Sequence, residues 1–158
     1  MKIIFIALFM ILGSLAQADA TSPVCTSNHQ PLPVNNDQII KFKSQTPNGY
    51  HDRGHVTGKV TQIFPDATNH NHFEITLLAT PATTLEIIYQ QSFGRLPDLQ
   101  VGDSIEACGD YITSNDNFNG YKPSPDGAII HWVHRGSGHE AHDDGYVMVN
   151  GVVFGGVR

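Results

Sequence analysis

The sequence predicts an all-β protein, a small OB-like Greek-key barrel of about five strands with a C-terminal hairpin. Two observations lead to this prediction. From residue 55 onwards, short segments alternate apolar and polar residues, and a period of two is typical of strands with one buried face. A short connector with Gly94 and Pro97 then stands where a helix would need more residues. A β-sandwich is the alternative, although a barrel leaves fewer unpaired edges with so few strands.

Residues 1–20 have the features of a signal peptide. Lys2 gives a positive start, residues 3–15 form an apolar run too short for a membrane-spanning helix, and Ala18-Asp19-Ala20 suits signal peptidase. No later apolar run is long enough to span a membrane. We therefore expect an exported protein, periplasmic or secreted. Residues 21–52 would form an extended N-terminal lead-in, and residues 53–158 the OB-like β domain.

The strands of the predicted barrel follow in order. Residues 38–42 form an isolated apolar run, either a small strand or a helix turn. Strand one is expected over 55–64, where Gly58 allows a bulge or a sharp bend. Strand two covers 70–79, with Phe73 and alternate residues on its apolar face, and strand three covers 84–90.

The second half of the chain continues the pattern. The expected elements are a single turn within 92–99, a fourth strand at 104–112, a polar loop at 114–127 and a fifth strand at 128–134. Asn150-Gly151 then separates two short apolar runs, which is the strongest short signal for a β-hairpin.

Two cysteines remain in a chain that is expected to be exported. An oxidising compartment favours a Cys25–Cys108 disulfide over two buried free thiols. Closing such a long loop stabilises a fold by roughly 4 kcal/mol in chain-entropy models.

The overall charge of the protein makes anionic binding partners less favourable. The formal net charge is −6 with neutral histidines, so the protein has no global attraction for nucleic acid or anionic lipid. Nucleic acid stays a candidate that the charge does not favour. We expect a monomer that binds a small ligand or an oligomeric substrate.

The stretch from Gly127 to Gly145 concentrates the reactive side chains. It holds four of the nine histidines and the only tryptophan of the chain. The residues are His131, Trp132, His134, His139 and His142, followed by the acidic pair Asp143 and Asp144.

This stretch carries a resemblance. Ile130-His131-Trp132-Val133-His134, then His142-Asp143-Asp144-Gly145-Tyr146 and the Asn150-Gly151 turn, resemble a family of small exported bacterial proteins catalogued only as a domain of unknown function. His70 with Phe73, and Val101-Gly102-Asp103, match its upstream strand and turn. This chain departs from the family at three places, with Gly136-Ser137 for Asp-Pro, Ala141 for Arg and Tyr146 for Trp. The resemblance covers about residues 53–154 and implies no activity.

A metal site is one interpretation of the histidines. His70 and His72 lie two apart on a strand, so both rings project from one face. His139 and His142 can meet one ion if their loop makes a helical turn. The cofactor that suits this pattern is a divalent metal ion such as zinc, with His70 and His142 as ligands.

Hydrolysis of a phosphodiester or another ester, with or without a metal, is another interpretation. In a regular strand His131 and His134 face opposite sides, so only a bulge brings both into one site. The catalytic candidates are His131, His134, His142 and Asp144. The binding candidates are His70, His72, Arg53, Trp132 and Arg135.

A non-catalytic role stands beside these. OB barrels often serve as binding modules, and clustered histidines can make binding sensitive to pH. In the plainest interpretation His131 is a hydrogen-bonded packing residue, Trp132 belongs to the core, and His29, His51 and His55 are solvated. Enzyme and binding module remain open alternatives at this stage.

Overall fold

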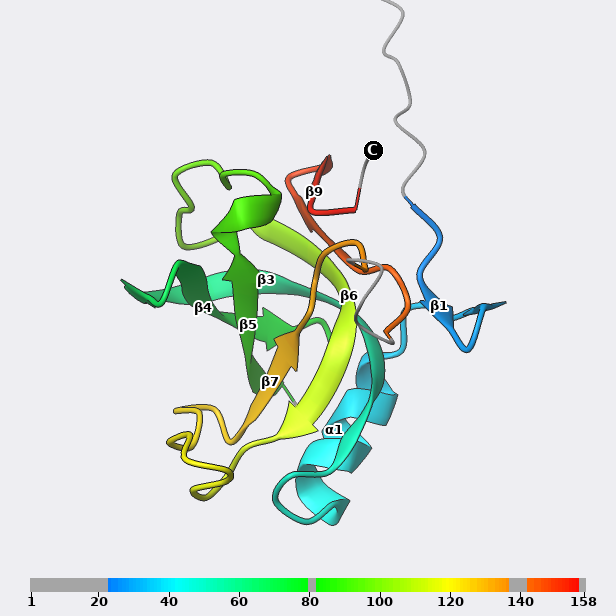
Figure 1. Cartoon of the computed structure of the whole chain (residues 1–158), viewed down its shortest axis with the longest axis vertical. Coiled ribbons are helices and arrows are strands. Elements are labelled where there is room, and N and C mark those ends of the chain that lie inside the picture. The colour runs from blue at the N-terminus through cyan, green and yellow to red at the C-terminus, as the bar shows by residue number, and fades with distance from the viewer. Residues whose placement is uncertain (1–22, 80–81, 137–141, 157–158) are drawn as a thin grey trace, which may run out of the picture.

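The computed structural model describes residues 23–79, 82–136 and 142–156. The expected signal peptide at 1–20 and His139 lie outside these residues. Figure 1 shows a curved sheet wrapped into a barrel, with one helix beside it. In the parts described, no helix is long and apolar enough to cross a membrane.

Five strands close the barrel with the connectivity predicted from the sequence. They are β3 (His51–Ala67), β4 (His70–Leu77), β5 (Thr84–Gln90), β6 (Ser104–Thr113) and β7 (Ala128–His131). Their order is β3-β4-β5-β7-β6, and β6 pairs back with β3. The pairing of β5 with β7 is parallel and the others are antiparallel. The all-β, OB-like prediction is confirmed.

The connectors also follow the prediction. The single turn between β5 and β6 is the 3-10 helix η1 (Gln91–Phe93). Strand β8 (Tyr146–Val149) pairs with β6 and with β9 (Val152–Phe154). Asn150 and Gly151 both have positive φ, as a tight hairpin turn of twisted strands requires.

Residues 38–42 belong to a helix, which is longer than the small strand or helix turn expected from the sequence. Helix α1 (Asn36–Gln45) begins after Asn35, whose side chain accepts a hydrogen bond from the backbone N–H of Gln38. Ile39 is buried in the core. The Asn36 amide donates to the carbonyl oxygens of Thr57 and Leu78, which fixes the helix to the barrel.

Strand β7 ends at His131, three residues before the predicted end at 134. Trp132 has a φ of 49°, a left-handed conformation that a bulky L-residue seldom adopts. The chain therefore leaves the strand at Trp132 and does not continue its alternation.

Interior and exterior of the barrel differ sharply in polarity. Fully buried side chains fill the interior, among them Val56, Phe73, Ile75, Ile87, Tyr111 and Ile130. Burial of each such side chain contributes about 1.5–3 kcal/mol. Arg53, Asp110 and His131 are cross-strand neighbours on β3, β6 and β7, so they share the outward face. This outward face carries the candidate site.

The predicted disulfide is present. Cys25 bonds to Cys108 on β6, and both residues are buried. The bond fastens the small hairpin formed by β1 (Thr26–Ser27) and β2 (Gln30–Pro31) to the outside of the barrel.

Candidate functional site

The rings of five histidines and one tryptophan form a continuous row on the outside of the barrel. We call this set of side chains the imidazole row. Its members are His70, His72, His131, Trp132, His134 and His142. Ring centroids lie 6.3 Å apart for His70–His72, 5.5 Å for His70–His131, 4.4 Å for His131–Trp132, 6.0 Å for Trp132–His142 and 5.5 Å for His142–His134. Every histidine singled out from the sequence as catalytic or metal-binding, within the described parts of the chain, lies in this row.

Two features of the backbone bring the rings together. On β4, His70 and His72 are two residues apart and point outwards, opposite to the buried Phe73. At the end of β7, the left-handed Trp132 interrupts the alternation that would have separated His131 from His134. The strand ends between these two histidines and does not bulge, and both rings belong to the row.

Oxygen atoms fix the tautomers of two imidazoles on β4. The Nδ1 atom of His70 lies 2.8 Å from the carbonyl oxygen of Thr68, and that of His72 lies 2.8 Å from Oε1 of Glu86. Because these oxygens accept, each neutral ring carries its proton on Nδ1 and a lone pair on Nε2.

The same arrangement recurs at the other end of the row. The Nδ1 atom of His134 lies 2.8 Å from the carbonyl oxygen of Arg135, and that of His142 lies 3.0 Å from the carbonyl oxygen of Asp143. His134 also stacks on Phe93, with ring centroids 3.8 Å apart.

His131, at the centre of the row, is neutral at physiological pH. Burial is the main cause that lowers its pKa to about 4, and the nearby His70, His134 and His72 lower it further. Asp110 acts in the opposite direction. A ring with this pKa is a lone-pair donor at neutral pH, and it is a weak base for proton transfer.

Glu86 on β5 was not identified from the sequence. Its carboxylate is buried, accepts from His72 and accepts from the Ser124 hydroxyl at 2.6 Å. A lone glutamate in the apolar run Leu85–Tyr89 was the available signal, since a buried charge requires a partner.

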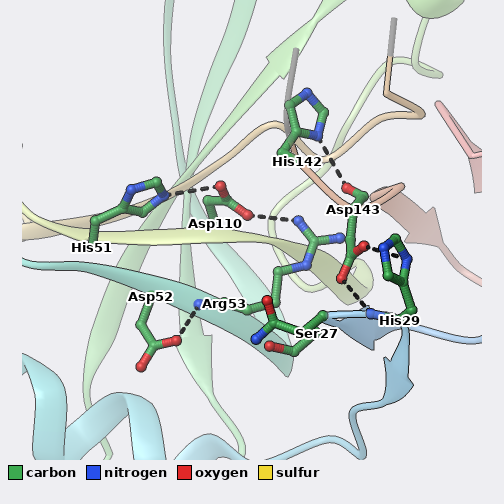
Figure 2. A pocket seen from close by; sticks show the side chains of 9 residues that line it. Ser27, His29, His51, Asp52, Arg53, Asp110, His142 and Asp143 are labelled. Atoms are coloured by element: carbon green, nitrogen blue, oxygen red, sulfur yellow. Dashed lines mark hydrogen bonds and ion pairs between the residues drawn. The ribbon is translucent and has the colours of Figure 1, made fainter. Parts of the chain in front are cut away.

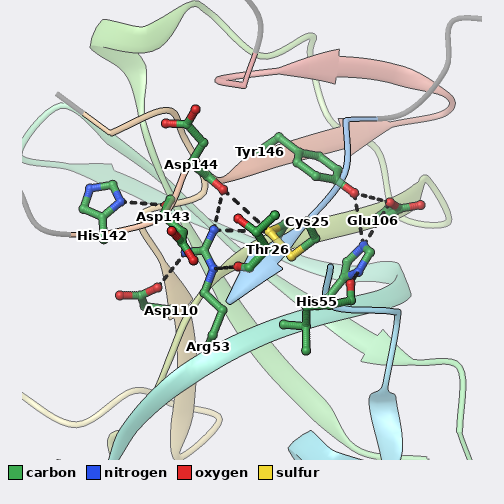
Figure 3. Close-up of a disulfide and its surroundings, with 12 residues drawn as sticks. Cys25, Thr26, Arg53, His55, Glu106, Asp110, His142, Asp143, Asp144 and Tyr146 are labelled. Carbon is green, nitrogen blue, oxygen red and sulfur yellow. Dashed lines mark hydrogen bonds and ion pairs between the residues drawn. A yellow bond between two sulfur atoms is a disulfide. The ribbon is translucent and has the colours of Figure 1, made fainter. Parts of the chain in front are cut away.

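The Arg53 guanidinium forms its hydrogen bonds with oxygen and sulfur atoms of the protein itself, as Figure 3 shows. Its side chain is only 6% exposed and pairs with Asp110 at 2.6 Å. The guanidinium also donates to the carbonyl oxygens of Thr26 and Asp144 and to Sγ of Cys108. It therefore holds the disulfide-bonded N-terminal segment against the loop that carries His142.

The remaining sequence candidates lie at the margin of the row. Arg135 is exposed. Asp144 is exposed too, and its Oδ1 accepts from the Gly136 N–H at 2.7 Å, which closes the base of the loop. Trp132 is half-buried and is not among the core residues.

A hollow of about 630 Å³ adjoins the row at His142 (Figure 2). Its lining includes three carboxylates, Asp52, Asp110 and Asp143, and one cation, the internally paired Arg53. His51 lies 2.9 Å from Asp110, and the N-terminal hairpin reaches the hollow through His29, whose backbone N–H donates to Asp143 at 3.2 Å. The acidic lining favours positively charged ligands.

His55 differs from the expectation that it is solvated. It is buried, and its ring nitrogens contact the carbonyl oxygen of Leu32 at 2.8 Å and Glu106 at 3.0 Å. The Tyr146 hydroxyl joins the same group by donating to Glu106. This cluster connects β3 and β6 with the N-terminal segment at Leu32 and with β8 at Tyr146.

A metal cage is not preassembled within the described residues. No three His, Cys, Asp or Glu side chains there are already arranged to hold one ion. The row instead presents separate imidazoles from β4 and from the end of β7.

Fold and site together define a small OB-type barrel with an imidazole row on its outer face and a disulfide-fastened N-terminal segment. The chain belongs to the family described as "Protein of unknown function (DUF3465)", whose model matches residues 28–155. No curated protein gives a significant match. The family is uncharacterised, so the function must be argued from the site.

Proposed function

We propose that this chain is an exported binding module whose imidazole row holds a cation. The observation that carries this proposal is the convergence of His70, His72 and His131 from two strands. Fixed tautomers give His70 and His72 lone pairs on Nε2, and His131 is neutral at physiological pH. Lone pairs attract positively charged groups and do not attract phosphate.

The negative charge of the protein also favours a cation as the ligand of the row. The formal net charge is −6, and the neighbouring hollow carries three carboxylates against one paired arginine. An anionic phosphodiester would meet repulsion there, whereas a cation is drawn towards the row.

Hydrolysis has less support. The low pKa of His131 makes it a poor general base at neutral pH. Both cysteines are in the disulfide, which removes them as nucleophiles. Arg53, expected to bind an anionic substrate, uses its guanidinium within the protein.

Export is part of the proposal. The signal-peptide features of residues 1–20 and the Cys25–Cys108 disulfide both suit an oxidising compartment outside the cytosol.

The only tryptophan supplies the assay, because Trp132 lies in the row. Its fluorescence is titrated with spermine and zinc chloride as cations, and with inorganic phosphate and a dinucleotide as anions, at constant ionic strength. Cations are expected to change the emission saturably, and less so as falling pH protonates the imidazoles.

The matched control is Tyr121→Asn, because Tyr121 is a ring with 78% exposure that lies outside both the row and the hollow. The control should bind as the wild type does, whereas His131→Asn should bind less. Saturable binding of the anions alone, or turnover of bis-p-nitrophenyl phosphate that disappears in His131→Asn, would refute the proposal.

A further inference from the structure

The geometry points to a divalent d-block ion, of the class of zinc, copper or nickel, as the ligand of the row, with His70, His72 and His131 as its protein ligands. This inference rests on the proposed cation-binding function and names its ligand. Imidazole is a preferred ligand of these metals.

The spacing of the rings suits shared coordination. Two imidazoles bound to one zinc at the usual Zn–N distance of about 2.0–2.1 Å have ring centres about 5 Å apart. The rings of His70 and His131 are separated by 5.5 Å and those of His70 and His72 by 6.3 Å. Both separations are somewhat larger than this value, so coordination of one ion requires the rings to lie closer together than they do in this structure.

The oxygens behind the rings match the surroundings of metal-binding histidines. Such a histidine generally donates its second N–H to a carboxylate or a backbone carbonyl. His72 donates to Glu86 and His70 to the Thr68 carbonyl, both at 2.8 Å. Glu86 is itself fixed by the Ser124 hydroxyl.

Glu86 gives the strongest independent support. Its side chain is only 7% exposed, and its Oε1 accepts a hydrogen bond from Nδ1 of His72. A buried carboxylate needs compensating positive charge. A metal ion on Nε2 of His72 supplies that charge through the ring, so we assign Glu86 the role of a positioning residue.

His142, the other ligand expected from the sequence, has Trp132 and His134 as its neighbours in the row. We therefore place the ion at the β4 end of the row, where His70 meets both His72 and His131. The three imidazoles leave at least one coordination position for water or for a ligand brought by the ion.

The test uses the mature chain without a polyhistidine tag, treated with EDTA and then dialysed. Zinc binding is measured by calorimetry, and zinc content by elemental analysis after equilibrium dialysis. The expected result is one zinc per chain. Electron paramagnetic resonance of the Cu²⁺ form should show coupling to imidazole nitrogens.

Variants locate the site. His70→Ala and His131→Ala should each weaken zinc binding at least tenfold, and His29→Ala should not change it. Glu86→Gln keeps an acceptor for His72 but removes the charge, so it should weaken binding about 10–100-fold with an unchanged thermal midpoint. Equal affinity in His70→Ala and the wild type, or equal loss in His29→Ala, would overturn the inference.

The outcomes separate the two proposals. If zinc, copper and nickel all fail to bind while spermine still changes Trp132 emission, the metal inference is wrong and the cation-binding function stands. If neither metals nor spermine bind, both are wrong. Thermal melts of each variant show whether a loss of binding reflects a loss of fold.

Discussion

His131 makes the stability of this protein depend on pH in a way that one substitution can reveal. Its pKa falls from 6.5 to about 4 on folding, chiefly because of burial. At pH values above the ordinary imidazole pKa, the ring is neutral in both the folded and the unfolded state, so its protonation does not change the stability. As the pH falls towards 4, the unfolded chain binds a proton that the folded chain resists, so stability is lost.

The size of the effect follows from the shift. A lowering of about 2.5 pKa units corresponds to about 3 kcal/mol, since each unit is worth 1.36 kcal/mol. His131→Asn cannot bind that proton. Its free energy of unfolding should therefore fall by about 3 kcal/mol less than that of the wild type between about pH 7.5 and about pH 4.

The assay is urea unfolding of both proteins at several pH values across this window, followed by circular dichroism. His70, His72, His134 and Asp110 surround His131 and are present in both proteins, so the difference between the two curves reports on His131. Parallel curves would refute the reasoning, because they would mean that His131 is as easily protonated in the folded state as in the unfolded one.

Three further variants test the fold and its charges. Replacing Cys25 and Cys108 together by Ala should lower the free energy of unfolding by about 4.5 kcal/mol, given their separation of 83 residues; equal urea midpoints would contradict this. Gly145→Ala places a Cβ against the backbone oxygens of Trp132 and Cys108. Thermal melting should therefore show that the free energy of unfolding falls by several kcal/mol. An unchanged midpoint would be evidence against this packing. Burial raises the pKa of Asp126 to about 6, so Asp126→Asn should be more stable than the wild type at neutral pH, with an advantage that shrinks as acid protonates Asp126; an advantage constant over pH would exclude this explanation.

The sequence was most informative about the barrel. Alternation on β4 and β5 and the Asn150-Gly151 turn depend on local patterns that the folded chain retains. Helix α1 was underestimated because its apolar run is short, although Asn35 offered an N-cap signal.

The end of β7 illustrates what local patterns miss. Nothing in the type of residue predicts that Trp132 adopts a left-handed conformation, since bulky side chains disfavour it. Tertiary packing imposes this conformation, and with it the position of His134 beside His142.

The site was only partly predictable for a related reason. Histidines stand out in a sequence, so the members of the row were found. The carboxylates near the row, Glu86 on β5 and Asp110 on β6, lie within largely apolar strands, and only the register of these strands shows that they face His72 and Arg53.

The bond between Cys25 and Cys108 also places most of the barrel within one covalent loop. The chain between them contains α1, β3, β4 and β5, and Cys108 lies opposite His55 where β6 joins β3. These elements therefore stay tied into a closed loop when the protein unfolds, which limits the conformations open to the unfolded chain. An oxidant acting on the nascent chain would find no neighbouring thiol, and covalent locking would await the synthesis of β6.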